Sequence, residues 1–205
     1  MEQAGPLGVS GVSRETQSRL AIYVELLLRW NATINLISRR DEPMVWERHI
    51  ADSLALLPLI PEAATHAIDL GSGAGLPGLV LAIASGRAFA LVEADQRKAA
   101  FLREAARATA APVTVHAVRI ETLSLPAAPL LTARALAPLA DLLGWAERFL
   151  APGGVCLFPK GRTALDELTQ ARAQWHMQAE RVASPTEPAA SILRISEITR
   201  VRQRN

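Results

Sequence analysis

The stretch with the clearest chemical meaning runs from Ile68 to Gly78 and reads Ile-Asp-Leu-Gly-Ser-Gly-Ala-Gly-Leu-Pro-Gly. An apolar segment that carries one carboxylate, Asp69, leads into four glycines, and an apolar, helix-like segment follows at 79–83. A strand, a glycine loop and a helix in this order present backbone N–H groups and a helix N-terminus to a ligand. Glycine suits such a loop because it adopts positive φ freely and has no side chain to hold a ligand away. The stretch therefore predicts a ligand-binding loop.

Two kinds of ligand compete for this loop. The dinucleotide pattern G-x-G-x-x-G is present at Gly73, Gly75 and Gly78, which leaves a nicotinamide-dependent oxidoreductase open. That pattern should begin where the strand ends. The strand is expected to end at Leu70, so the better-placed triplet begins one residue later, at Gly71, and continues through Gly73 and Gly75. This register argues against a dinucleotide.

Two carboxylates at expected strand ends point to a different cofactor. Asp69 would repel a pyrophosphate, but it can bond the amine of an amino-acid moiety. Glu93 ends the next expected strand, where a carboxylate hydrogen-bonds both ribose hydroxyls of an adenosine. Strand, acid and glycine loop, followed by strand and acid, is the order found in S-adenosylmethionine-dependent Rossmann methyltransferases. The sequence favours S-adenosylmethionine as cofactor, with S-adenosylhomocysteine as product.

The elements that must position this loop alternate in type along the chain. Such β/α alternation predicts an α/β fold of the Rossmann-like class I methyltransferase kind, with a mostly parallel twisted sheet and helices on both faces. The expected strands are 67–70, 89–93, 113–117, 130–133 and 155–158, and the expected helices are about 78–85, 97–109, 138–150 and 163–173. Segments 174–181 and 191–195 predict an antiparallel hairpin at the sheet edge.

The N-terminal part is expected to be helical. Residues 1–62 should form a loose tail (1–12) and a helical cap, joined as one structural unit to the methyltransferase domain at 63–205. Ser13 is a suitable cap for a first helix. A second helix is expected from Asp41, with a proline in its first turn, to Pro58.

Composition and charge narrow the class of protein. The 205 residues hold one cysteine, Cys156, and a net charge of +2, and all but two of the 22 basic residues are arginines. We expect a soluble, monomeric, cytoplasmic protein, because no apolar run is long enough to span a membrane and a single cysteine forms no internal disulfide. The histidines lack metal-ligand spacing, so no metal is expected. The tail at 200–204 is basic, and we expect it to be solvated.

Several further stretches carry a family resemblance that runs from about residue 14 to residue 200. In order and spacing they resemble the bacterial 16S ribosomal RNA guanine-N7 methyltransferase family RsmG, also called glucose-inhibited division protein B. The stretches are Trp30-Asn31 with Asn35-Leu36, Arg48-His49-Ile50-x-Asp52-Ser53, the loop from Asp69 to Gly78, Glu93, Arg97-Lys98 with Phe101-Leu102, Arg119-Ile120-Glu121, Ala133-Arg134-Ala135 and Lys160-Gly161.

The resemblance implies a set of cofactor contacts. The positions matching Gly71, Leu76, Ile120, Glu121 and Arg134 would contact S-adenosylmethionine, with the backbone near Ile120 at the adenine. The ribose position, usually Asp, is Glu93 here, and the usual serine before the arginine is Ala133. The implied partner is 16S ribosomal RNA or the small ribosomal subunit.

The implied reaction needs little acid–base chemistry. Guanine N7 carries an in-plane lone pair and attacks the sulfonium methyl in line without losing a proton, so no general base is required. Proximity and alignment should supply most of the acceleration, and we expect a target in folded RNA to be unstacked into the pocket. We expect Arg134 and Lys160, at the ends of the fourth and fifth strands, to act catalytically by positioning cofactor or guanine.

The RNA contacts are the least defined part of the hypothesis. His49 lies on one helical face with Asp52 and Ser53, and this face either docks the cap or contacts RNA. Alternatively, Arg39 and Arg40, and the basic side chains of the helix after Glu93, are ordinary solvated groups. The candidate RNA-binding residues are Arg39, Arg40, Arg48, His49, Arg97, Lys98 and Arg162.

Two other functions remain open from the sequence. One is a methyltransferase with a small-molecule or protein substrate. The other is a non-catalytic nucleotide-sensing module.

Overall fold

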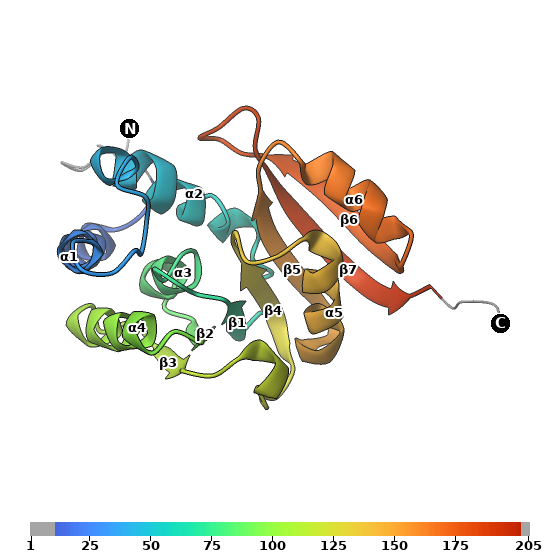
Figure 1. The fold of residues 1–205 in the computed structure, drawn as a ribbon, viewed down its shortest axis with the longest axis horizontal. Coiled ribbons are helices and arrows are strands. Elements are labelled where there is room, and N and C mark those ends of the chain that lie inside the picture. Colours follow the sequence, from blue (N-terminus) through green and yellow to red (C-terminus); the bar gives the residue numbers. More distant parts are fainter. Residues whose placement is uncertain (1–10, 202–205) are drawn as a thin grey trace.

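The computed structural model describes residues 11–201, so most of the predicted loose tail (1–12) and of the predicted basic tail (200–204) lies outside the described residues. Within them, seven strands form one sheet in the order β3-β2-β1-β4-β5-β7-β6 (Figure 1). Strand β7 runs antiparallel to both of its neighbours, β5 and β6, and the other pairs are parallel. The strands are β1 His66–Leu70, β2 Ala88–Val92, β3 Val113–His116, β4 Ala128–Ala133, β5 Leu150–Lys160, β6 Trp175–Ala183 and β7 Ser191–Arg200. This confirms the predicted mostly parallel sheet with a C-terminal hairpin.

Helices cover both faces of the sheet, as predicted. Along β5, Val155 and Leu157 face one core, whereas Cys156 and Phe158 face the other. The first core is completed by α1 Arg14–Asn31, α3 Gly78–Ser85 and α4 Gln96–Ala108, and the second by α5 Leu139–Phe149 and α6 Ala164–Arg172. Side chains alternate between faces along a strand, so apolar runs buried on both sides are what this fold requires.

The cap shares its core with the sheet domain. Ser13 caps α1 by accepting a hydrogen bond from the Thr16 N–H at 3.1 Å, as its residue type predicts. The helix packs on α3 and α4, and Arg19 donates to the Thr109 carbonyl at 2.7 Å at the end of α4. Cap and sheet are therefore parts of one folded body (Figure 1).

The second cap helix was predicted as one regular helix, and the structure confirms this only in part: residues 45–54 are continuously helical, but part of the segment is π-helical and 3₁₀ turns lie on either side. The segment is a 3₁₀ turn η1 Glu42–Met44, a π-turn η2 Trp46–Ile50, a short helix α2 Ala51–Leu54 and a 3₁₀ turn η3 Leu57–Leu59. The Ser53 hydroxyl donates to the His49 carbonyl at 2.7 Å, a local bond that competes with regular helical bonding. Prolines at the starts of η1 and η3 favour tight turns. Apolar periodicity alone does not reveal these breaks.

The C-terminal hairpin is longer than predicted. β7 pairs with β5 on one side and with β6 on the other, so β6 is the edge strand. Arg200, the first residue of the expected solvated tail, is the last residue of β7. Its side chain bonds Glu147 at 3.1 Å and lies 4.6 Å from the ring centre of Trp175, and it remains 65% exposed. No helix in the described range is long and apolar enough to cross a membrane.

Candidate active site

The glycine loop follows β1 directly, at the carboxyl edge of the sheet. Gly71, Gly73 and Gly75 all have positive φ, of 64°, 52° and 86°. The Ser72 N–H donates to the Val92 carbonyl at 2.9 Å, which fixes the loop to the end of β2. Three left-handed positions within five residues explain why glycine is needed here.

Glu93 holds this loop from the neighbouring strand. Its two carboxylate oxygens accept from the backbone N–H groups of Gly73 and Asp95, each at 2.8 Å. A carboxylate has about four acceptor positions, so Glu93 keeps further lone pairs for a ligand hydroxyl pair. The longer side chain, compared with the usual Asp, is thus partly used within the protein.

Asp69 lies beneath the loop, not on a ligand-facing surface. It is only 1% exposed, and one oxygen accepts from the Thr132 hydroxyl on β4 at 2.5 Å. The other oxygen faces the start of α3, where a Cβ on Gly78 would lie 2.7 Å from it. Burial raises the pKa of Asp69 to about 6, against hydrogen bonds that lower it. Asp69 therefore shapes the turn from β1 into α3.

A cavity of about 440 Å³ opens in front of the loop. It brings together the predicted residues Gly71, Gly73, Leu76, Glu93, Ile120, Glu121 and Arg134 with Lys98, which was predicted to bind RNA. The rest of its lining is Leu36, Ser72, Ala74, Val92, Ala94, Val118, Arg119, Ala135, Leu136 and Trp145. Gly75 is absent from this lining, because it packs against α3 and α4, where a Cβ would lie 2.9 Å from that of Leu79.

The donor and acceptor set of this cavity fits S-adenosylmethionine. Glu93 offers a carboxylate at the position of a ribose diol, and Trp145, Ile120 and Leu136 offer apolar surface for an adenine. A Cβ on Gly71 would lie 2.5 Å from the Leu136 side chain, so only glycine leaves room at this wall. The sequence prediction missed Trp145 and Leu136, which lie on α5 and in the segment before it and belong to no glycine or acid motif.

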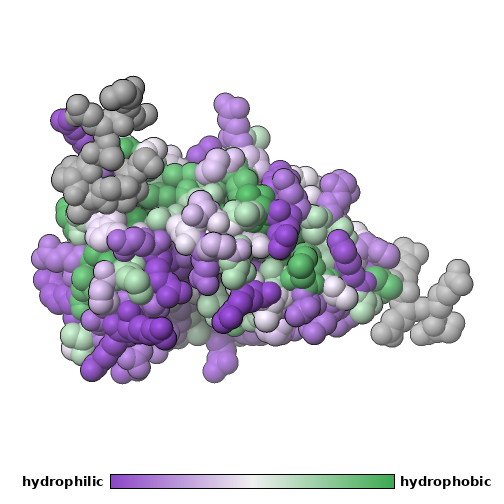
Figure 2. All heavy atoms as spheres, turned by 90° about the horizontal axis from the view of Figure 1, so that it is seen from above, coloured by the Kyte–Doolittle hydropathy of each residue, from purple (hydrophilic) through white to green (hydrophobic). Residues whose placement is uncertain are grey.

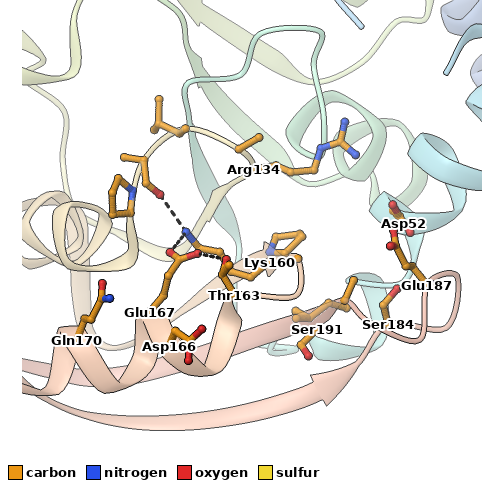
Figure 3. A pocket seen from close by; sticks show the side chains of 18 residues that line it. Asp52, Arg134, Lys160, Thr163, Asp166, Glu167, Gln170, Ser184, Glu187 and Ser191 are labelled. Atoms are coloured by element: carbon orange, nitrogen blue, oxygen red, sulfur yellow. Dashed lines mark hydrogen bonds and ion pairs between the residues drawn. The ribbon is translucent and has the colours of Figure 1, made fainter. Parts of the chain in front are cut away.

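A second cavity, of about 790 Å³, adjoins the first. The two share only Arg134, Ala135 and Leu136, the segment that follows β4. Figure 3 shows Lys160, Thr163 and Glu167 gathered along one part of the second cavity, with Asp52, Ser184 and Glu187 along another. The cap, the segment after β4, α6 and the β6–β7 loop all contribute to it.

Arg134 is the charged residue common to both cavities. Its Nη1 lies 3.2 Å from Nδ1 of His49 in the π-turn of the cap. Burial lowers the pKa of Arg134, and the nearby Tyr23, Asp52, Asp69 and Asp41 oppose that shift. The predicted position of Arg134 at the end of the fourth strand thus brings it to the junction of the two cavities.

Lys160 lies in the wall of the second cavity, and its ammonium group is already bonded. Nζ donates to Glu167 on α6 at 2.7 Å and to the Ala137 carbonyl at 2.9 Å. The side chain is 10% exposed. These two bonds connect the segment after β4 to α6. Lys160 therefore has a structural role, and its ammonium group is not free to contact a guanine.

The candidate RNA-binding residues differ in exposure and in their partners. Arg39, Arg40, Arg97 and Arg162 are exposed. Arg48 is also exposed, but it pairs with Asp41 at 3.5 Å and with Glu187 at 3.6 Å. His49 is largely buried, and Lys98 lines the smaller cavity. Figure 2 shows hydrophilic side chains gathered at the end of the molecule where α1 and α4 lie.

Tyr23 links the cap to the glycine loop, a contact that the sequence did not reveal. Its hydroxyl donates to the Ala74 carbonyl at 2.6 Å, and its side chain is fully buried. In the sequence, Tyr23 reads as one more apolar position on the face of α1.

Within the described residues, no group of three His, Cys, Asp or Glu side chains is placed to hold a metal ion.

Two solved structures with similar folds are named as a methyltransferase and a methylase. An O-methyltransferase from Bacillus cereus in complex with SAH matches with a TM-score of 0.57 at 15% identity, covering 85% of this chain and 90% of that chain. A ribosomal protein L11 methylase from Lactobacillus delbrueckii matches with a TM-score of 0.55 at 17% identity, covering 72% and 76%. At such low identity, the likeness establishes the Rossmann-like methyltransferase fold.

Sequence relatives are much closer. A protein from Granulibacter bethesdensis named Ribosomal RNA small subunit methyltransferase G is 62% identical over 192 residues, which are 94% of this chain and 90% of the relative. A protein of the same name from Acidiphilium cryptum is 57% identical, covering 98% of this chain and 99% of the relative. Residues 16–192 match the family described as GidB, rRNA small subunit methyltransferase G. The chain therefore belongs to the rRNA small subunit methyltransferase G family.

Proposed function

We propose that this protein transfers a methyl group from S-adenosylmethionine to N7 of one guanine in 16S ribosomal RNA. The observation that carries the proposal is the pair of adjoining cavities that meet at Arg134, in a chain of this family. The smaller cavity would hold the cofactor and the larger one the acceptor base. A ribosomal RNA substrate implies a cytoplasmic protein, and we propose that it acts as a monomer on RNA or on the small subunit.

In the smaller cavity, the chain's own groups would fix the cofactor by its two ends. S-adenosylmethionine supplies an electrophilic methyl group when bound. The Glu93 carboxylate would accept from the ribose hydroxyls, and the apolar surface of Ile120 and Trp145 would hold the adenine. Arg134, at the other side, would be available to the carboxylate of the cofactor.

In the larger cavity, Asp52 is the group best suited to select guanine. Guanine presents two adjacent donors, N1–H and the N2 amino group, and a carboxylate accepts from both, whereas adenine presents an acceptor at N1. Asp52 lines this cavity, and one of its oxygens accepts from the Thr186 hydroxyl, which fixes the orientation of the carboxylate. A guanine bound in this way has its opposite edge, with N7, free to face the junction of the cavities.

The residues of the site suit methyl transfer to N7 without a general base. N7 reacts through a lone pair, and the base becomes cationic as the bond forms. Carboxylates at the cavity wall, from Asp52 and Glu187, are the groups that stabilise such a charge. Arg134 can donate to O6 of the guanine, which lies beside N7. Holding the two reactants in line accounts for the rest of the rate.

The direct test uses labelled S-adenosylmethionine and small subunits from a bacterial strain that lacks its own enzyme of this family. We expect label in 16S ribosomal RNA, at a guanine where borohydride reduction and aniline cut the chain, as they do at N7-methylguanosine. Label on another base or another atom would overturn the substrate assignment. Naked RNA, tested beside the subunit, identifies the form that the protein accepts.

The cofactor site is tested separately by Gly71→Val. Gly71 has a φ of 64° and no room for a Cβ beside Leu136, so the variant should lose S-adenosylmethionine binding by at least about 10²-fold. Gly86→Val is the matched control, because Gly86 has a φ of 68° but no atom near the added Cβ. Binding unchanged in Gly71→Val would place the cofactor elsewhere.

A further inference from the structure

The contact between His49 and Arg134 joins two parts of the chain that are far apart in sequence. His49 comes from the cap and Arg134 from the end of β4, and Nδ1 and Nη1 are 3.2 Å apart. Arginine only donates, so Nδ1 must be the acceptor. The imidazole is therefore neutral, with its proton on Nε2. Burial, followed by the charge of Arg134, lowers the pKa of His49 to about 4, which agrees with a neutral ring.

The other side of the ring is also defined. Nε2 is buried without a hydrogen bond, and its nearest acid is Asp41, with Oδ2 3.8 Å away. The charged groups that face the ring are Arg134, Asp41 and Arg48. Asp41 lies directly before η1 and pairs with Arg48 at 3.5 Å. At 3.8 Å the Asp41 carboxylate is too far from Nε2 for a hydrogen bond, so it faces the ring only as a charge, and the contact with Arg134 sets the tautomer.

The local backbone is built to deliver this side chain. His49 lies in the π-turn Trp46–Ile50, a local widening of the helix that changes the direction of its side chains. The carbonyl of His49 accepts from the Ser53 hydroxyl at 2.7 Å, and Ser53 is 1% exposed. A regular helix through this segment would aim His49 differently.

From these contacts we propose that His49 is a positioning residue, which holds the Arg134 guanidinium at the junction of the cofactor and acceptor cavities. The cap then contributes to methyl transfer through Arg134 and does not merely cover the sheet. This inference rests on the proposed function. Of the two roles that the sequence left open for His49, docking of the cap and RNA contact, the proposal extends the first.

The test compares two substitutions of His49 with different chemistry. His49→Leu removes the acceptor, and His49→Gln keeps an oxygen that can accept from Arg134. We expect kcat for methyl transfer to the small subunit to fall on the order of 10–100-fold in the leucine variant, because small misplacements at a reacting centre cost this much. The glutamine variant should recover most of that loss. KM for the subunit should change little in both, since no RNA contact is removed.

A double-mutant cycle separates positioning from a merely structural effect. In an Arg134→Gln background, His49→Leu should lower kcat by less than about 3-fold, because the group that it positions is gone. Arg19→Met is the structural control, since it removes bonds that dock the cap, to the Thr109 and Ala110 carbonyls, without removing a contact of His49 or Arg134. Full additivity in the cycle, or equal kcat losses in the leucine, glutamine and Arg19→Met variants, would overturn the inference. Absence of methyl transfer in the unsubstituted protein would instead refute the proposed function.

Discussion

Arg134 and Lys160 show how far residue type and position determine a role. Both follow a strand at the carboxyl edge of the sheet, and the sequence predicts the same role for them. Arg134 meets both cavities and a neutral histidine, whereas Lys160 is bonded to Glu167 and to the Ala137 carbonyl. The partners that make this difference come from the cap and from α6. His49 is 85 residues from Arg134, and Glu167, although only seven residues from Lys160, reaches it from a separate helix. The sequence alone therefore did not distinguish the two cations.

Selection of guanine can be tested at Asp52. Asp52→Asn replaces one acceptor oxygen by a donor, which would face a guanine donor, so methylation should fall about 10–100-fold, as for loss of one bidentate base contact. S-adenosylmethionine affinity should be unchanged, because Asp52 does not line the smaller cavity. Thr186→Val removes the bond to Asp52 but keeps the carboxylate, and it should retain most activity. Equal losses in both variants would mean that Asp52 acts by holding the β6–β7 loop.

Occupation of the smaller cavity should be visible through Trp145. This residue lines the cavity, whereas Trp30, Trp46 and Trp175 do not. Titration with S-adenosylhomocysteine should therefore change the tryptophan fluorescence, and Trp145→Phe should abolish most of that change while keeping an apolar ring. The affinity of the phenylalanine variant, measured by calorimetry, should stay within about 10-fold. A fluorescence response that survives the substitution would contradict the placement of the adenine beside α5.

At the scale of elements, alternation and turn residues predicted the sheet domain well. The ends of β1 and β2, the glycine loop and α3 follow from local signals: an apolar run, a change to glycine, and a helical period. The sequence predicted the second cap helix but not its π-helical segment, because neither the Ser53 bond nor the wider turn at η2 alters the apolar period. Asp69 was misplaced for a related reason. Sequence gives its place at the strand end but not the side to which its carboxylate turns.

The burial of Asp69 gives a pH dependence whose sign follows from its pKa. The pKa is about 6 in the folded protein, above the usual 3.8, so folding takes up a proton between these values. The protonated Asp69 carboxyl therefore adds to the free energy of unfolding; this stabilisation is fully present below about pH 4 and is lost as pH rises through 6. In Asp69→Asn this loss is absent, and the Thr132 hydroxyl can accept from the new amide. In urea unfolding, the free energy of unfolding of the wild type should fall by about 3 kcal/mol relative to that of Asp69→Asn between pH 4 and pH 8. A pH-independent difference would show that Asp69 is charged when folded.

At the scale of the whole molecule, the cap and the sheet share one core and both contribute to the site. Leu36, His49 and Asp52 come from the cap and reach the cavities or Arg134. The stretches that carry the family resemblance predicted where the site lies. They did not predict that the cap and the sheet share a core, because this depends on the packing of α1 against α3 and α4. That packing is not encoded in any single motif.

The RNA hypothesis predicts different salt responses for the two ligands. Binding to the small subunit should weaken steeply as salt rises, because arginines that meet phosphates release counterions. S-adenosylhomocysteine binding should change little, since it involves few such contacts. The double variant Arg39→Gln with Arg40→Gln should reduce the salt slope by about 2 if both residues meet phosphates. Filter binding at several salt concentrations measures the slope. A shallow slope for the unsubstituted protein would argue against a phosphate-dominated interface.

The placement of β7 between β5 and β6 sets an order for the protein during its own synthesis. β6 has only β7 as a neighbour in the sheet, so it cannot join until the later strand has left the ribosome. Every residue that lines the smaller cavity lies at or before Trp145, whereas the larger cavity needs Ser184 to Ile192. A growing chain thus contains the whole cofactor lining well before it contains the last wall of the acceptor cavity. The ability to accept a base arises only when the protein is almost complete.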